Sequence, residues 1–290
     1  MTHRVEADYR LAGHVRQLVA DVYGAAASAV VLAPGTLAGL RLVFAALGVR
    51  RVLLSAGEYF AASSFPDLRV EVVDVYDLLE VVARRRPGAV ILSAVTWQGE
   101  LLPLASVFRH IRARLGGRAR APLLVADYAH AGAAGFPRVA DSAADIVVGD
   151  VTKWITPPSW PDRIGYLWFR SAVHRALARR LFAPFYLACE KPTAALEARW
   201  VDPQAVEKVA AFRMSAKPTR GELVERAAND LALARRMAGW CSEPQPTSSL
   251  LWVESAAGVA KIPTWVEDQG LLWRPASGGA RVMCRSDLAP

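Results

Sequence analysis

Short apolar runs alternate with longer amphipathic segments over the first two-thirds of the chain. The runs are rich in Val, Ile and Leu without strict polar alternation, which is typical of strands covered on both faces. We predict seven strands, at Val30–Ala33, Arg51–Ala56, Val70–Val75, Ala89–Val95, Leu123–Asp127, Asp145–Val148 and Ile164–Phe169. Helical apolar spacing fills the segments between and before them, at Leu11–Tyr23, Thr36–Leu47, Tyr76–Arg86 and Leu104–Leu115. This alternation predicts an α/β fold, with a mostly parallel seven-stranded sheet and helices on both faces.

The pattern changes after about Ala183, where prolines and tryptophans become frequent. A long helical pattern then runs from about Arg220 to Trp240. Short strand-like runs follow it, at Leu250–Glu254, Leu271–Arg274 and Arg281–Arg285. We therefore predict a large α/β domain over residues 1–183, a crossing segment at 184–220 that packs on it, and a small α+β domain over 221–290.

Composition places the chain among ordinary globular proteins, with 53% hydrophobic and 21% charged residues in 290 positions. No apolar run reaches the length of about 20 residues that a bilayer span needs, and the charged N-terminal segment lacks the apolar centre of a signal peptide. The three cysteines, Cys189, Cys241 and Cys284, form no CxxC pair, so we expect neither a disulfide framework nor a metal site. A reducing cytoplasm is the expected location.

The net charge of +8 raises the question of nucleic-acid binding. The arginines are mostly scattered along the chain, and aromatic residues do not alternate with them as in a base-stacking surface. We therefore expect no nucleic-acid partner, and assign some of the cations to an anionic cofactor or substrate.

Two charged residues follow consecutive predicted strands. Asp127 ends the strand LLVAD, and Lys153 comes just after the next strand pattern. Ligands of open α/β sheets bind at the carboxyl ends of the strands, so both side chains are expected in one crevice. A lysine that forms an imine and a carboxylate that keeps a pyridine nitrogen protonated are the pair that pyridoxal 5′-phosphate (PLP) chemistry requires. A surface lysine and a turn-forming aspartate are the alternative interpretation.

A candidate phosphate site lies after the first strand. Gly35 and Thr36 open a helix there, and the free N–H groups of a helix N-terminus bind anions. A simple helix cap by Thr36 is the alternative.

These segments, in their order along the chain, resemble the class V aminotransferase and cysteine desulfurase family of fold type I PLP-dependent enzymes. PGTLAGL resembles the family's phosphate loop, which includes Gly35 and Thr36. AGEYFAASSFP resembles the segment whose aromatic residue stacks on the cofactor ring, and Tyr59 takes that position. ADYAHAGAAG implies that Asp127 binds the pyridine nitrogen and that His130 binds the phenolic oxygen.

Two further segments resemble parts of the family's cofactor site. GDVTKW resembles the Schiff-base motif around Lys153, with Asp150 where a phosphate-binding serine is common and Thr152 before the lysine. A carboxylate beside a phosphate is repulsive, so Asp150 is expected to serve the fold or the substrate unless it turns away. SAVTWQGELLPL resembles the turn near the phenolic oxygen, where Thr96 or Gln98 would serve.

The resemblance also implies phosphate and substrate contacts from later segments. FRMSAKPTRG resembles the segment that reaches a partner subunit's phosphate, through Lys217, Thr219 and Arg220. ARVMCRSDLAP and LLWRPASGG imply that Arg285, with Arg274 nearby, binds the substrate α-carboxylate. Trp97 would give an apolar contact to the substrate.

The family's N-terminal arm and the helix after its carboxylate-binding arginine have no counterpart in this sequence, so we expect a reduced small domain. The resemblance implies a homodimer with a shared active site. Cys284 lies beside Arg285 rather than on the loop that carries the catalytic cysteine of desulfurases, which disfavours a persulfide route.

The resemblance implies an enzyme that acts on a small amino acid through an external aldimine in a biosynthetic pathway. Aminotransfer and elimination (C–S or C–C lyase chemistry) share the early steps, and the sequence leaves both open. A catalytically degenerate partner subunit or scaffold is the alternative, and a PLP-free α/β binding protein is a third. The presence of Lys153, Asp127, His130 and Arg285 together favours the enzyme.

Overall fold

The computed structural model describes residues 2–59, 62–115, 121–151, 153, 164–173, 177, 219–241, 243–254, 256–264, 272–273 and 279–286. Thr152, Lys217, Arg274 and the cysteine at position 189 lie outside these residues, and so does nearly all of the predicted crossing segment. No helix in the described ranges combines the length and the apolar character that a membrane span requires.

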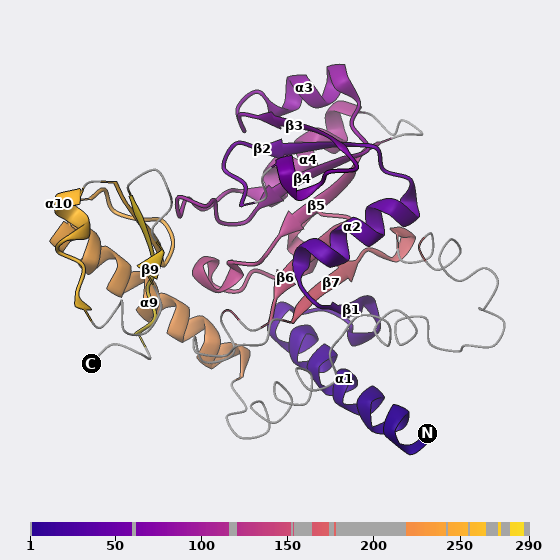
Figure 1. Cartoon of the computed structure of the whole chain (residues 1–290), viewed down its shortest axis with the longest axis horizontal. Coiled ribbons are helices and arrows are strands. Elements are labelled where there is room, and N and C mark those ends of the chain that lie inside the picture. The colour runs from indigo at the N-terminus through magenta and orange to yellow at the C-terminus, as the bar shows by residue number, and fades with distance from the viewer. Residues whose placement is uncertain are drawn as a thin grey trace.

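A seven-stranded sheet forms the centre of the larger body (Figure 1). Its strands are β1 (Val30–Ala33), β2 (Arg51–Ser55), β3 (Arg69–Val73), β4 (Ala89–Ser93), β5 (Leu123–Asp127), β6 (Ile146–Asp150) and β7 (Gly165–Phe169). The order is β1-β7-β6-β5-β4-β2-β3. Strand β7 pairs antiparallel with both neighbours, and the pairs from β3 to β6 are parallel. The predicted mostly parallel sheet is confirmed.

Two apolar clusters explain why these strands lack polar alternation. Val30 and Leu32 of β1 pack in one cluster, and Val31 and Ala33 pack in the other. Successive side chains of a strand point to opposite faces, so each face of the sheet must have its own cover. Both faces are therefore buried, as the sequence pattern predicts.

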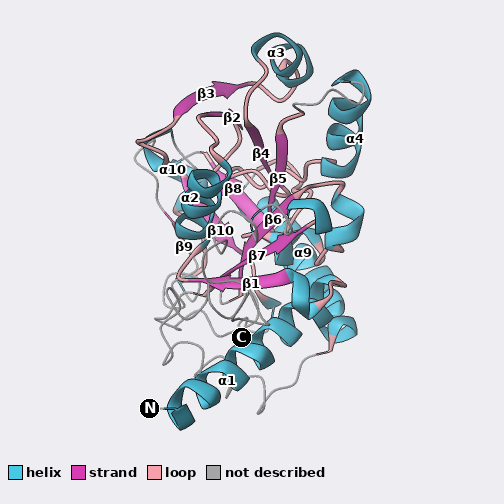
Figure 2. Cartoon of the chain, turned by 90° about the vertical axis from the view of Figure 1, so that its right-hand side faces the viewer, coloured by secondary structure: helices cyan, strands magenta, loops and turns pink. Residues whose placement is uncertain are grey.

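Helices cover the two faces unequally. The first face packs against α1 (Thr2–Tyr23), α3 (Leu78–Arg85), α4 (Leu104–Leu115) and the start of α9 (Arg220–Cys241). The second packs against α2 (Thr36–Leu47), which lies across the sheet from α4 in Figure 2. The α1 helix begins at Thr2 rather than near Leu11, because the charged segment before Leu11 continues the helix without a Pro or Gly interruption.

A smaller antiparallel sheet lies beside the large one, with α9 and α10 (Ala256–Val259) packed near it (Figure 1). Its strands are β8 (Leu250–Val253), β9 (Leu272–Trp273) and β10 (Ala280–Met283), in the order β8-β10-β9. The second half of α9 shares a separate apolar cluster with β8 and β10. One helix thus contributes to both cores, while the predicted domain boundaries stay a prediction.

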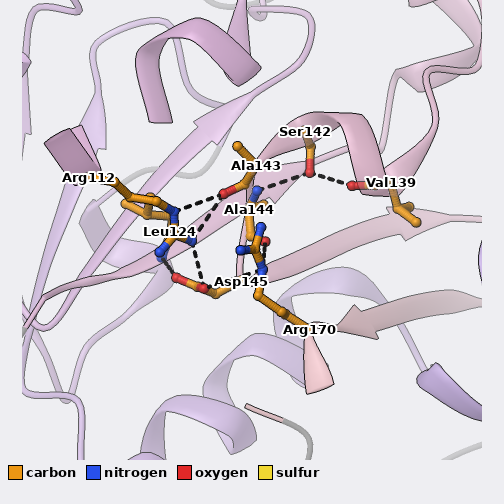
Figure 3. Close-up of polar contacts among 8 residues, drawn as sticks. All are labelled: Arg112, Leu124, Val139, Ser142, Ala143, Ala144, Asp145 and Arg170. Carbon is orange, nitrogen blue, oxygen red and sulfur yellow. Dashed lines mark hydrogen bonds and ion pairs between the residues drawn. The ribbon is translucent and has the colours of Figure 1, made fainter. Parts of the chain in front are cut away.

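A polar cluster ties β5 and β6 together at the edge opposite their carboxyl ends (Figure 3). Asp145 accepts a hydrogen bond of 2.7 Å from Arg112 Nη2 and one of 3.0 Å from the backbone N–H of Leu124. Arg112 also donates to the carbonyl of Ala143, and Arg170 donates to the carbonyl of Ala144. These bonds join α4 and the end of β7 to the loop before β6, and so fix the frame that supports the opposite edge.

Candidate active site

Asp127 and Lys153 lie at the carboxyl ends of neighbouring parallel strands. Asp127 ends β5, its Cα pairs with Val148 of β6, and Lys153 follows β6 by three residues. Asp127 is buried and accepts a 2.7 Å hydrogen bond from the N–H of Ala129. Burial raises the pKa of Asp127 to about 6, although the Ala129 bond and the Lys153 charge lower it in part. The carboxyl group and the lysine therefore lie at the same edge of the sheet, close enough for the Lys153 charge to act on Asp127.

His130 joins this pair from the turn after β5. Its Nε2 atom lies 3.2 Å from Lys153 Nζ, and the ring is buried. Burial, together with the charges of Lys153 and Arg281, lowers the pKa of His130 well below its ordinary value. The imidazole is therefore neutral at physiological pH and can accept a hydrogen bond from the lysine amine.

The Tyr59 ring forms an aromatic wall at the same place. Lys153 Nζ lies 5.2 Å from the ring centroid, and the guanidinium carbon of Arg281 lies 5.4 Å from it. The ring also meets the His130 ring edge-on, at 6.5 Å and 63°. Tyr59 is 49% exposed, so a planar ligand entering from solvent can reach its face.

Arg281 is a site residue that the sequence prediction missed. It lies on β10, is buried, and places Nη2 3.4 Å from His130 Nε2 and Nη1 3.4 Å from the carbonyl oxygen of Trp97. Burial lowers its pKa to about 10. One signal was available, because an arginine inside an apolar strand is rarely buried without a specific task. Arg285, the predicted carboxylate-binding residue, is also buried, and its role stays a prediction.

The turn after β4, which includes Trp97, is tied to the segment that leads into the small sheet. Leu101 N–H donates to Thr247 Oγ1 at 3.0 Å, and Ser248 Oγ donates to the Gly99 carbonyl at 2.7 Å. A Cβ at Gly99 would lie 1.9 Å from the Leu250 carbonyl oxygen, so this close approach requires glycine. Trp97 packs edge-on against Trp252, with centroids 4.8 Å apart.

Thr96 and Gln98 flank Trp97 and differ in their surroundings. Thr96 is buried, and its Oγ1 accepts a 3.0 Å hydrogen bond from Glu100 N–H. Gln98 is exposed and lines a pocket of about 330 Å³ with Glu243 and Thr247. Their predicted contacts with the cofactor stay predictions.

The N-terminus of α2 lies against Gly165 of β7. A Cβ at Gly165 would come within 2.6 Å of the Gly35 carbonyl carbon and 2.7 Å of Thr36 N. Gly35 has φ 148°, a conformation that favours glycine, and as the N-cap residue it has no side chain with which to cap the helix. The first N–H groups of α2 are thus arranged as in helix-terminal anion sites.

Asp150 pairs in register with Gly165 and is buried beside this loop. Its Oδ1 accepts a 3.2 Å hydrogen bond from the backbone N–H of Lys153. The carboxylate therefore stabilises the turn that carries the lysine, which accounts for an acid next to a predicted phosphate site.

Thr219 starts α9 with reciprocal capping bonds. Its N–H donates to Glu222 Oε2 at 2.6 Å, and Glu222 N–H donates to Thr219 Oγ1 at 3.2 Å. The sequence Thr-Arg-Gly-Glu is the capping-box pattern that produces this arrangement. The hydroxyl has a structural task, and its predicted phosphate contact stays a prediction.

Several solved structures are similar to this chain in fold. A ureidoglycine–glyoxylate aminotransferase from Bacillus subtilis matches with a TM-score of 0.68 and 14% identity, over 96% of this chain and 81% of that one. A cysteine desulfurase from Thermococcus onnurineus matches at 0.67 and 15%, over 98% and 81%. The cystine C–S lyase C-DES matches at 0.66 and 15%, over 97% and 83%.

The chain has the fold of these enzymes. The fold type I architecture that the sequence resemblance implied is therefore confirmed. No family model matches the chain, and no curated protein sequence matches it significantly.

Proposed function

We propose that this protein is a PLP-dependent enzyme that acts on a small amino acid. The observation that carries the proposal is the meeting of Lys153 and His130, with Asp127 on the adjacent strand end. A lysine on the solvent-exposed surface would not lie beside a buried, neutral imidazole and a buried carboxyl group. The arrangement therefore argues against the surface-lysine alternative. The fold shared with PLP-dependent enzymes supports the same assignment.

The residues present fit PLP at each of its polar positions. Lys153 would attach the cofactor through its amine, and Asp127 would bind the pyridine nitrogen. His130 would donate to the phenolic oxygen through whichever ring nitrogen carries the proton, and Tyr59 would pack on the ring. The phosphate would lie at the α2 N-terminus, against the Gly35–Gly165 contact.

Bound PLP supplies an electron sink for the negative charge that develops at the substrate Cα. Lys153 would remove and return the proton at that carbon. Asp127, ionised at neutral pH because its pKa is about 6, would hold the pyridine nitrogen in its protonated form. His130, neutral in this environment, would accept a hydrogen bond from the lysine amine and would place no second positive charge beside it.

We propose Arg281, in place of Arg285, as the group that binds the substrate α-carboxylate. Its guanidinium lies beside His130 and Tyr59, and a guanidinium binds a carboxylate through two parallel hydrogen bonds. A buried arginine with a lowered pKa recovers favourable interactions when an anion binds next to it. This contact would select amino acids over amines.

Aminotransfer and elimination remain the two reaction classes in the proposal. The purified protein with PLP is incubated with single amino acids, in the presence and absence of a keto-acid acceptor. Keto acid that exceeds one equivalent of the enzyme only with the acceptor identifies an aminotransferase, whereas continued release of ammonia or sulfide without it identifies an elimination-type lyase. No product from any amino acid, with PLP bound, would favour the catalytically degenerate subunit.

A cytoplasmic homodimer with a biosynthetic role completes the proposal. It rests on the resemblance and on the charged, cysteine-poor sequence. Light scattering of the purified protein tests the assembly, and a monomer with full activity would contradict a shared active site.

A further inference from the structure

Glu58 is a buried acid next to the proposed cofactor site. It follows β2 by three residues, directly before Tyr59, and is only 8% exposed. Both carboxyl oxygens contact one residue of β4. Oε1 accepts a hydrogen bond from Ser93 N–H, and Oε2 accepts one of 2.5 Å from the Ser93 hydroxyl.

Ser93 connects Glu58 to Asp127. Strands β4 and β5 pair in parallel, with Ser93 directly opposite Asp127. Directly paired residues point to the same side of a sheet, and neighbouring strands lie about 4.8 Å apart. The side chain of Ser93, which contacts Glu58, therefore lies on the same side of the sheet as that of Asp127.

Two carboxyl groups this close in a buried site do not both ionise readily. Burial raises the pKa of Glu58 to about 8, and the charge of Asp127 contributes in the same direction. Asp127 has the lower pKa, about 6, because the Ala129 N–H and the Lys153 charge favour its ionised form. At neutral pH the proton belongs to Glu58 and the charge to Asp127.

We propose that Glu58 is a positioning residue that acts as a neutral hydrogen-bond donor to Ser93, so that the Ser93 hydroxyl can donate to ionised Asp127. In the structure the Ser93 hydroxyl donates to Oε2, and protonation of Glu58 on that oxygen would reverse this bond. Ser93 N–H already donates to Oε1, so the acid proton lies on Oε2 and points to Ser93 Oγ. The serine then has its own proton for Asp127. Ionised Glu58 would take that proton back and add a second negative charge beside Asp127.

The charged groups that act on the proposed Glu58–Ser93–Asp127 relay lie on two strands and their ends. Asp127 follows on β5 and is the charge that acts on Glu58. Lys153 and Asp150, at the end of β6, act on Asp127. Tyr59 is the next residue to Glu58, so the same hydrogen bonds also hold the proposed ring-stacking residue in place.

The first test needs no cofactor. The protein is labelled with ¹³C at glutamate side-chain carboxyls, and NMR follows each signal with pH. We expect one signal to titrate near pH 8, to disappear in Glu58→Gln, and to remain in Glu80→Gln, which changes an exposed glutamate of α3. A Glu58 signal that titrates in the ordinary acid range would overturn the inference.

The second test concerns the cofactor, and so rests on the proposed function. The absorption of bound PLP is measured against pH for wild type, Glu58→Gln, Ser93→Ala and Glu80→Gln. We expect wild type and Glu80→Gln to change as pH passes about 8, and Glu58→Gln to keep its neutral-pH spectrum without that change, because an amide donates like the neutral acid. Ser93→Ala should have an altered spectrum already at neutral pH.

The outcomes separate the two claims. Wild type that binds no PLP would contradict the proposed function, while the NMR titration still decides whether Glu58 is a neutral acid. If PLP binds and neither Glu58→Gln nor Ser93→Ala alters the pH profile, the cofactor assignment stands and the relay is wrong. If Glu58→Gln fails to fold, the Ser93→Ala profile and the wild-type NMR titration decide.

Discussion

Lys153 Nζ lies 3.2 Å from His130 Nε2, and the pKa of that histidine is lowered well below its ordinary value. The two residues are separated by a strand and its loops, so their meeting is a product of the fold. A neutral imidazole beside the amine can accept a hydrogen bond from it, whereas a protonated imidazole would repel a charged lysine. This relationship is the centre of the proposed PLP site.

Asp127→Asn is expected to reduce turnover by about 10²–10³-fold, the range typical of losing one well-placed electrostatic contact. An amide cannot hold the pyridine nitrogen in its protonated form. In the wild type, activity should fall as pH drops below about 6, since the required carboxylate is then protonated. Steady-state rates from pH 5 to 8 check both expectations.

In the cofactor-free protein, the contribution of Asp127 to stability should fall as pH rises, although activity is expected to rise with pH. The folded-state pKa of Asp127 is raised from 3.8 to about 6, so the folded protein retains a proton that the unfolded chain has lost. This contribution to stability falls as pH rises from about 4 to 6. Denaturant unfolding should show Asp127→Asn gaining stability relative to wild type over that window. An unchanged difference between the two proteins would contradict the raised pKa.

Arg281→Lys should raise the KM for the amino-acid substrate by about 10-fold or more, because an ammonium cannot bind a carboxylate through two parallel bonds. Arg285→Lys is the matched control, four residues along the chain and similarly buried. Substrate titrations of both variants decide between the two arginines. A large increase in KM for Arg285→Lys alone would restore the sequence-based assignment.

Gly165→Ala should weaken PLP binding, because its Cβ would meet the backbone of Gly35 and Thr36 and displace the α2 N-terminus. Gly239→Ala in α9 is the control, since a Cβ there meets nothing within 4 Å, and it should stabilise the helix by up to about 1 kcal/mol. Equilibrium dialysis with PLP measures the first effect and thermal unfolding the second. Equal PLP affinity in both variants would exclude this loop as the phosphate site.

Asp145→Ala should lower the free energy of unfolding by about 1–3 kcal/mol, because it leaves the buried N–H of Leu124 without its acceptor. The ion pairs with Arg112 and Arg170 contribute less, since both guanidinium groups are partly exposed. Glu80→Ala removes an exposed pair with Arg84 and should change stability by less than about 0.5 kcal/mol. Urea denaturation compares the two.

Most strands of the large sheet were predictable because they carry apolar side chains on both faces, whereas the edge strand β3 exposes Val72. The pairing of Asp127 with Lys153 followed from the same pattern, since the ends of consecutive parallel strands meet at one edge. The boundaries shifted by one or two residues, as in β3, which starts at Arg69 and ends at Val73. Local propensity does not determine such ends.

Arg281 and Glu58 were missed for physical reasons. Two arginines stand four residues apart in ARVMCR, and the contacts of the small sheet with the turn at Trp97 decide which of them reaches His130. Glu58 follows a strand, where a turn residue is expected, and its burial depends on Ser93, 35 residues further along the chain. Both depend on tertiary contacts that periodicity does not encode.

Borohydride reduction followed by peptide mass mapping tests the central claim most directly. The purified protein is loaded with PLP, reduced, digested and compared with Lys153→Ala treated in the same way. We predict one pyridoxyl-modified peptide in the wild type, with the modification on Lys153, and none in the variant. Modification of a different lysine, or an equal yield from Lys153→Ala, would contradict the account.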